Sequence, residues 1–496
     1  MSIDVHQLDV FVLWGSAVTF LAILAVRVSS RTRLPSLLLY LAMGVALGES
    51  GFGIGFEDAE LSHSLCFLAL FVILAEGGLT TPWRDVRPSI RLGLSLATVG
   101  VAVSVVVVAV GTHFLLGLRW ETAVLLGALT SPTDAAAVFS VLRVVPLPKR
   151  LTGALEAESG LNDAPIIVIV TIISTGGLDE HGLLYNAGLV AYELVGGLAL
   201  GLAIGFAGAW VMRRAALPSS GLYPLAVLAL CLLSYGAAAA CHASGFAAVY
   251  VAALVLGNAE LRHRAATRSF AEGLAWLSQI GLFVMLGLLL SPSRLDLRTV
   301  LYAVVAGLVL TLVARPLSVA VSAVAQPRPA RELAFVSWAG LRGAVPIVLA
   351  TIPLANGVGD SERLFDLVFV LVVIDTLVTG PTLPWVAKVL RVTRRSEPRG
   401  LDIEAAALER VAADLLQVTI APTSKMHGVE VGELRLPPGC SVSMVIRDGE
   451  TLVPERRTVL KHGDDLLVVA PRRQREKTEE RLRQVSARGR LAQWLG

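Results

Sequence analysis

Long apolar runs are the feature that most limits what this chain can fold into. A helix rises about 1.5 Å per residue, so about 20 apolar residues cross the roughly 30 Å hydrocarbon core of a bilayer. By this criterion there are about thirteen candidate spans, at 8–27, 34–50, 61–80, 92–116, 121–142, 152–176, 184–212, 221–240, 243–258, 267–290, 298–324, 332–356 and 364–390. Hydrophobic residues make up 55% of the chain and charged residues only 16%, which excludes an ordinary soluble protein. The sequence therefore predicts an α-helical polytopic membrane protein.

The loops between these runs differ in charge. Basic loops follow the odd-numbered spans, whereas the acidic segments GESGFGIGFEDAE and GLDEHG follow the second and the sixth. Basic loops stay in the cytoplasm, so we expect a cytoplasmic (inner) membrane protein with its N-terminus outside and its C-terminus inside. That orientation requires an odd number of spans, in agreement with the count. Only Arg294 and Arg298 lie against the trend.

Composition also excludes several other functions. A net charge of +3 suggests no nucleic-acid partner. The cysteines form no CxxC pair, so we expect neither a disulfide framework nor a zinc site from Cys66, Cys231, Cys241 and Cys440. There is no P-loop, HExxH or GxSxG motif and no repeated carbonyl filter motif, so an enzyme or a channel is not indicated. No cofactor is expected.

The fifth span contains polar residues where they are costly. Its segment LTSPTD places Pro132 in mid-membrane, beside Ser131, Thr133 and Asp134. A helix broken here exposes carbonyls and helix ends, and transporters bind ions at such breaks. The alternative is a proline kink whose freed carbonyls bond to the neighbouring Ser and Thr.

The sixth span contains a cluster of oxygen ligands in ALEAESGLNDAP. Glu158 and Asn162 lie one helical turn apart, as do Ser159 and Asp163. A monovalent cation prefers oxygens of this kind, and a carboxyl group in a low-dielectric cavity is suited to proton exchange. The alternative is that 152–163 forms a loop, which would leave a very short span.

Two arginines lie in the eleventh and twelfth spans, and one further acid lies in the third span. Arg315 needs a partner at its depth, for which we expect Glu158, unless it reaches the cytoplasmic surface instead. Gly340, Gly343 and Pro346 weaken the helix around Arg342 in the twelfth span. The fifth and twelfth spans are each the fifth of six on either side of the seventh, which predicts inverted repeats with two broken crossing helices. Glu76 either serves the ion path or faces the interface.

The segments TSPTD, ESGLNDAP, FVILAEGGL and LRGAVP together resemble the monovalent cation:proton antiporters, the sodium/hydrogen exchanger superfamily of the NhaP type. The resemblance covers the membrane domain and implies a thirteen-helix inverted-repeat homodimer that works by alternating access. The family's ion and proton carrier falls on Asp163, with Asn162 beside it in a form associated with electroneutral exchange. The family's other ion ligands fall on Thr133, Asp134 and Ser159. Its structural ion pair falls on Glu158 and Arg315, and its crossing-helix arginine falls on Arg342.

The C-terminal region is soluble in character. ADLLQVTIAP, CSVSMVIRDG and DDLLVVAP predict short strands separated by turns. This region resembles the RCK or TrkA-C module of potassium-conductance regulators, which implies dimerisation and a small-molecule ligand in a small α+β cytoplasmic domain. No GxGxxG precedes it, so no nucleotide-binding half is expected. The last stretch is predicted to be an exposed charged helix or a partly disordered tail. We expect a transmembrane domain at 1–392, a linker at 393–409, the module at 410–472 and the tail at 473–496.

These features predict an antiporter that exchanges a monovalent cation for protons, in pH and cation homeostasis. Competition of the two species at Asp163 would couple their fluxes. Potassium is favoured over sodium because of the attached module, and no metal is expected beyond the transported cation. The alternative is a transporter-derived membrane sensor that signals through the C-terminal domain, although the intact Asp163 argues against it.

Overall fold

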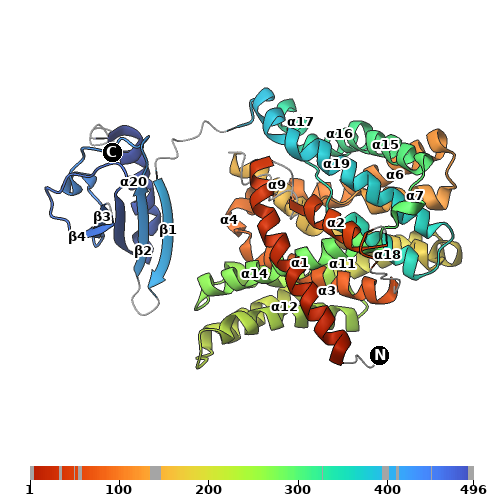
Figure 1. Ribbon diagram of the computed structural model, residues 1–496, viewed down its shortest axis with the longest axis horizontal. Coiled ribbons are helices and arrows are strands. Elements are labelled where there is room, and N and C mark those ends of the chain that lie inside the picture. Colours follow the sequence, from red (N-terminus) through yellow and green to blue (C-terminus); the bar gives the residue numbers. More distant parts are fainter. Residues whose placement is uncertain are drawn as a thin grey trace. The chain divides into compact units, whose positions relative to one another are not determined.

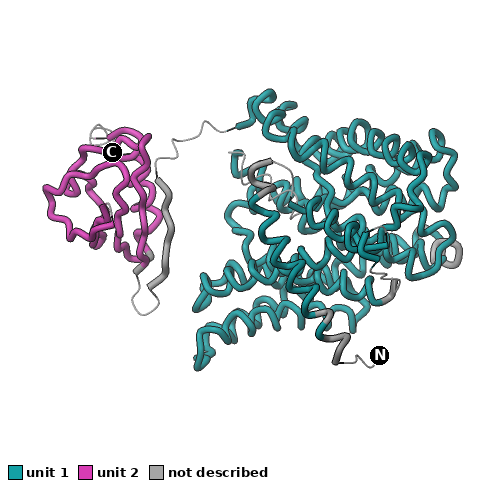
Figure 2. The backbone as a smooth tube through the Cα atoms, viewed as in Figure 1, with its two compact units in different colours: residues 1–393 teal, residues 394–496 magenta. Residues whose placement is uncertain are grey.

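The chain forms two compact units, residues 1–393 and 394–496 (Figure 2). The computed structural model describes residues 5–32, 36–49, 51–53, 59–134, 147–324, 326, 328–393, 401–408, 413–447 and 449–489. The first unit is helical and the second is built around a sheet (Figure 1).

The principal helices of the first unit follow the predicted apolar runs. They are α1 (Val5–Thr32), α2 (Ser36–Leu47), α3 (Ala59–Thr80), α4 (Trp83–Val86), α5 (Ile90–Ser95), α6 (Val101–Leu116), α7 (Trp120–Thr130), α9 (Lys149–Leu161), α10 (Asp163–Ser174), α11 (Gly177–Arg214), α12 (Leu222–Ala240), α13 (Gly245–Asn258), α14 (Arg264–Leu289), α15 (Leu297–Val309), α16 (Arg315–Ser322), α17 (Ala330–Trp338), α18 (Ala344–Ala355) and α19 (Ser361–Val389). Each of the predicted spans overlaps at least one of them. The end of the fifth predicted span, from residue 135, lies outside the described residues.

Length and composition make these helices suitable for a bilayer. Among the described residues, 8 helices are long and apolar enough to cross a membrane, and shorter apolar helices accompany them. Large apolar side chains such as Phe206, Trp210 and Leu312 are exposed on the outside of the unit. Contact of such an apolar surface with lipid tails is favourable, whereas its contact with water is unfavourable.

Small residues let the helices pack closely. A Cβ atom on Gly44 of α2 would lie 2.1 Å from the carbonyl oxygen of Val284 in α14. A Cβ atom on Gly201 of α11 would lie 2.6 Å from the carbonyl oxygen of Ala248 in α13. In lipid, burial of apolar area contributes little to helix association. Helices therefore associate through close backbone contacts of this kind.

Two π-helical turns of the first unit each contact the helix that adjoins the other turn. They are η2 (Leu96–Gly100), between α5 and α6, and η4 (Leu310–Ala314), between α15 and α16. Segment η2 contacts α16, and η4 contacts α6. The hydroxyl of Ser318 donates to the carbonyl of Gly100 at 2.7 Å, and that of Ser95 to the carbonyl of Ser322 at 3.1 Å. Because these are the fourth and eleventh predicted spans, the reciprocal contact fits two inverted repeats.

The second unit contains an antiparallel five-stranded sheet in the order β1-β2-β5-β3-β4. Its strands are β1 (Leu401–Leu408), β2 (Ala413–Ile420), β3 (Ser441–Arg447), β4 (Glu450–Leu452) and β5 (Asp465–Pro471). Alternate residues of β5 are buried, as a sheet with one covered face requires. Helix α20 (Arg475–Arg488) adds Leu482 and Val485 to the core under this face.

Two C-terminal expectations differ from the structure. Strand β1 lies inside the predicted linker, where LDIEAAAL has few of the β-branched and aromatic residues that signal strands. The predicted exposed tail helix is α20, and one face of it is buried through Thr478, Leu482, Val485 and Ser486. Apolar residues one turn apart are enough to dock a helix that is otherwise strongly charged. Residues 490–496 of the predicted tail lie outside the described residues.

Candidate functional site

The C-terminal end of α7 and the break between α17 and α18 meet at Asp134. Helix α7 ends at Thr130, and non-helical backbone separates α17 from α18. The backbone N–H of Asp134 donates to the carbonyl of Leu341 at 3.0 Å, and the N–H of Ala344 donates to Asp134 Oδ2 at 2.8 Å. A Cβ atom on Gly343 would lie 1.9 Å from the same carboxylate oxygen, so the close approach requires glycine.

Opposite charges lie at the two helix ends of this crossing. The first N–H groups of α18 have no acceptor within their own helix, and the Asp134 carboxylate supplies one. The guanidinium of Arg342 donates from Nε to the carbonyl of Thr130 at 3.1 Å, at the C-terminal end of α7. Arg342 is fully buried. The two predicted broken segments therefore stabilise each other's ends.

Three polar side chains form a hydrogen-bonded group beside this crossing. Asn162, between α9 and α10, donates from Nδ2 to Thr133 Oγ1 at 2.9 Å. Thr133 Oγ1 and Ser159 Oγ are 3.0 Å apart. All three residues are buried, and Asn162 Oδ1 has no hydrogen-bond partner among the described residues. This amide oxygen is therefore available to a ligand.

Asp163 lies beside that group, at the start of α10. It is 3% exposed, and its Oδ1 has no hydrogen-bond partner within the described part of the chain. Asp163 and Asp134 line a small cavity with Gln279 of α14, closed by apolar side chains from α3, α14 and α18. The cavity offers about 10 Å³ to a water-sized sphere. A buried carboxylate without a partner is costly, so a proton or a cation bound here would be stabilised.

The predicted ion pair lies next to this site. Arg315, the first residue of α16, donates from Nη2 to Glu158 Oε2 at 2.8 Å and from Nη1 to Oε1. The side chains are 3% and 1% exposed. Arg315 is therefore buried in a two-pronged pair and does not reach a surface, which removes the alternative that it extends to the cytoplasmic face.

The structure does not place every predicted residue in the cavity. Glu76 is partly buried in α3, beyond the cavity-lining residues Leu70, Ile73 and Leu74 of the same helix. Its role in an ion path stays a prediction. Within the described ranges, His, Cys, Asp and Glu do not gather in groups of three or more that could hold a metal ion.

Sequence reasoning missed two polar residues of this region. Gln279 is a polar residue inside an apolar run and lines the cavity. Asp375 lies in LVVIDTLVTG of α19, is 5% exposed, and accepts a hydrogen bond at Oδ1 from Thr311 Oγ1 at 3.2 Å. The cost of a charge in a membrane, which pointed to Arg315, was the signal that could have found Asp375.

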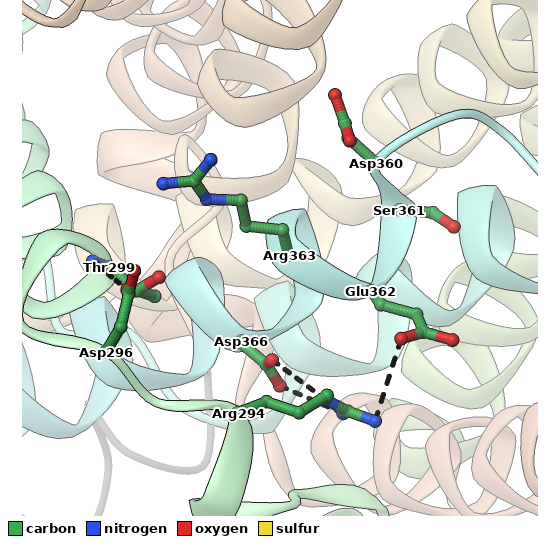
Figure 3. Close-up of a pocket in the computed structure, with 8 residues that line it drawn as sticks. All are labelled: Arg294, Asp296, Thr299, Asp360, Ser361, Glu362, Arg363 and Asp366. Atoms are coloured by element: carbon green, nitrogen blue, oxygen red, sulfur yellow. Dashed lines mark hydrogen bonds and ion pairs between the residues drawn. The ribbon is translucent and has the colours of Figure 1, made fainter.

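A separate charged pocket contains Arg294, one of the two exceptions to the loop charge pattern. Arg294 binds Asp366 through two hydrogen bonds of 3.1 Å, and its Nη1 lies 3.8 Å from Glu362. Figure 3 shows Arg294 between these two acids, which both come from the start of α19. The pocket has a volume of about 600 Å³. The positive charge of Arg294 is therefore balanced locally.

The comparisons with known proteins agree with this fold. A family model described as "Sodium/hydrogen exchanger, transmembrane" matches residues 16–389, and a TrkA-C domain model matches residues 415–483. The K(+)/H(+) antiporter NhaP2 of Shewanella oneidensis is 34% identical over 94% of this chain and 82% of that protein. The K(+)/H(+) antiporter NhaP of Alkalimonas amylolytica is 36% identical over 90% and 79%. The Na(+)/H(+) antiporter NhaS2 of a Synechocystis species is 28% identical over 70% and 65%.

A solved structure has the same membrane fold. The sodium proton antiporter MjNhaP1 from Methanocaldococcus jannaschii aligns with a TM-score of 0.65 and 20% identity, over 77% of this chain and 99% of that one. A helix end and a helix break that meet beside buried carboxylates are typical of a secondary transporter of the membrane, and the family model and the relatives show that class here. The chain belongs to the sodium/hydrogen exchanger family, with a TrkA-C domain at its C-terminal end. The predicted family and fold class are confirmed.

Proposed function

We propose that this chain exchanges a monovalent cation, potassium in preference to sodium, for protons across the cytoplasmic membrane. The observation that carries the proposal is the small cavity lined by two buried carboxylates, Asp134 and Asp163. A negative site enclosed by apolar walls needs a positive occupant, and either a cation or a proton satisfies it. Competition for one site couples the two fluxes.

Asp163 is the carrier in this scheme because its Oδ1 has no hydrogen-bond partner among the described residues. The same is true of Asn162 Oδ1, and both side chains are buried. Asn162, Thr133 and Ser159 are joined by hydrogen bonds, so they present ready-oriented oxygens to a cation. The Asp134 carboxylate also caps the N-terminus of α18, by accepting the hydrogen bond from the N–H of Ala344. We expect one cation to replace one proton, so that exchange is electroneutral.

Potassium is the preferred substrate in the proposal for two reasons. Relatives that are 34% and 36% identical over most of this chain are named K(+)/H(+) antiporters. The chain also has a TrkA-C domain, a module of potassium systems. Sodium remains the competing assignment, since the family description and a more distant relative name sodium.

The proposal extends to assembly and topology. We propose a homodimer in the inner membrane, with the N-terminus outside and the C-terminus in the cytoplasm, as the basic loops after odd-numbered spans favour. The C-terminal unit would set the pH or ligand threshold of exchange by binding a small molecule. Truncation after Thr393 should leave exchange intact and shift its activation. Complete loss of exchange in a correctly inserted truncation would contradict that role.

The test of the exchange itself is proton movement in everted membrane vesicles. Addition of potassium should dissipate a preformed pH gradient with wild-type protein and should have no effect with Asp163→Asn. Asp360→Asn is a matched control, because Asp360 is an exposed acid with a positive φ of 61° that asparagine also tolerates. A response to sodium alone would overturn the ion. No response to either ion, from inserted protein at several pH values, would overturn the antiporter in favour of a membrane sensor.

A further inference from the structure

Two buried arginines lie side by side behind the candidate site. A Cβ atom on Gly340 would lie 2.5 Å from Nε of Arg315 and 3.0 Å from Nη1 of Arg342. The two arginines are 2% and 1% exposed. Like charges this close in a membrane interior are costly unless each has its own anion. Glu158 is the anion of Arg315, so Arg342 needs another.

Asp375 of α19 is the acid in place for Arg342, because the next residue, Thr376, is hydrogen-bonded to the backbone of Arg342. The hydrogen bonds of the Arg342 guanidinium are to backbone carbonyls, those of Thr130 and Gly340. Its Nη2 and Oδ2 of Asp375 have no hydrogen-bond partner among the described residues. Both groups are buried, so their charges are screened little. Glu158, Arg315, Arg342 and Asp375 together form a buried set with no net charge.

Helix α19 also holds the backbone of Arg342. The hydroxyl of Thr376, the residue after Asp375, donates to the Arg342 carbonyl at 2.8 Å. Residues on either side of Arg342 contact the site, because Leu341 and Ala344 both hydrogen-bond to Asp134. A displacement at Asp375 would therefore move the segment that positions Asp134.

We propose that Asp375 is a positioning residue of the exchange site and the second-repeat counterpart of Asp163. The sixth and thirteenth spans are equivalent in the inverted repeats, and each contributes one buried aspartate next to a crossing segment. Arg342 is a permanent internal cation for Asp375, in the place where the first repeat admits a transported ion. Only the first repeat therefore takes up substrate, and the second repeat fixes the geometry. The effect on transport rests on the proposed exchange activity.

The experiment is a double-mutant cycle with Asp375→Asn, Arg342→Gln and the combined R342Q/D375N variant. Asp375→Asn leaves Arg342 unbalanced, so we expect the KM for potassium (or for sodium, if that is the ion) to rise at least about tenfold. The combined variant removes both charges and should recover most of that loss. Asp366→Asn is the matched control, since Asp366 is another buried α19 acid bound to an arginine. Its KM should stay within about twofold of wild type.

Thermal unfolding of the purified variants gives the second readout. If Asp375→Asn does not accumulate, the combined variant should still insert and melt close to wild type, which would support the charge balance. Failure of both variants, or a KM for Asp375→Asn within twofold of the Asp366→Asn value, would overturn the proposal. If wild-type protein shows no exchange, the proposed function fails, while the thermal coupling between positions 342 and 375 still tests the pairing.

Discussion

The Glu158–Arg315 pair and the two aspartates that line the cavity, Asp134 and Asp163, are both sets of buried charged side chains. They differ in how their charge is balanced. Arg315 meets both oxygens of Glu158, and the side chains are closed off from solvent. Asp163 keeps an oxygen without a partner among the described residues, beside an open volume. Buried charge that is fully paired holds helices together, whereas buried charge left unpaired is available to a mobile ion.

The largest effect that separates the two groups is expected at Asp163. Asp163→Asn removes the only titrating group that we assign to transport, so exchange should fall below detection. The thermal stability should be equal to that of wild type or higher, because a costly buried charge is gone. Vesicle exchange and thermal unfolding on the same preparation check both halves. A large loss of stability would place Asp163 with the structural pair instead.

The opposite result is expected at Arg315. Arg315→Ala leaves the Glu158 carboxylate buried and alone, which should cost about 3–5 kcal/mol of unfolding free energy. Glu158→Gln combined with Arg315→Gln should cost less than Arg315→Ala, since no charge is left unpaired. Thermal unfolding in detergent measures both. Normal melting of Arg315→Ala would refute the structural role of the pair.

A smaller effect is expected at Thr133, which links the cavity to its surroundings. Thr133→Val keeps the volume of the side chain but leaves Asn162 Nδ2 without its hydroxyl acceptor. A lost buried hydrogen bond costs about 1–3 kcal/mol, which we expect to appear as a KM raised about tenfold to a hundredfold for the cation. Ser159→Ala, which removes the other hydroxyl of the group, provides the comparison. An unchanged KM for Thr133→Val would exclude this hydroxyl as part of the binding geometry.

The smallest effect is expected outside the membrane, at a paired charge of the C-terminal unit. Burial raises the pKa of Asp464, but hydrogen bonds from Arg447 and the Lys461 N–H outweigh it, and the pKa is lowered overall. A lowered folded-state pKa stabilises above the unfolded value of about 3.9, and the gain disappears as the pH falls through the folded value. Asp464→Asn should therefore destabilise this unit at pH 7 and have little effect near pH 2. Hydrogen exchange of strand β5 in full-length protein at both pH values measures it, and an equal loss at both would contradict it.

The sequence predicted most of the site because a membrane makes charge expensive. Pro132, Asp134, Asp163 and Arg342 were identified by residue type and depth, and the structure brings their segments together. Asp375 satisfied the same rule and was missed, since nothing next to it in the sequence indicated a broken helix. Arg342, the partner that we propose for it, lies in the non-helical segment between α17 and α18, and such a long-range contact has no local signal.

The remaining gaps come from contacts made across the fold. Leu70 and Phe283 close the cavity from α3 and α14, and their apolar neighbours in the sequence look no different. Strand β1 pairs with β2 in the sheet, although the composition of β1 favours a strand only weakly. Helix α20 docks through few apolar residues, which a strongly charged sequence obscures.

The small size of the cavity has a consequence for the choice of ion. A space that offers about 10 Å³ to a water-sized sphere holds roughly one water molecule. An ion that enters must leave its hydration shell behind and accept carboxylate, amide and hydroxyl oxygens instead. Potassium gives up its water more cheaply than sodium does, because its larger radius holds each water less tightly. Selectivity then depends on the difference between this dehydration cost and the energy that the carboxylate, amide and hydroxyl oxygens of the site return to the ion.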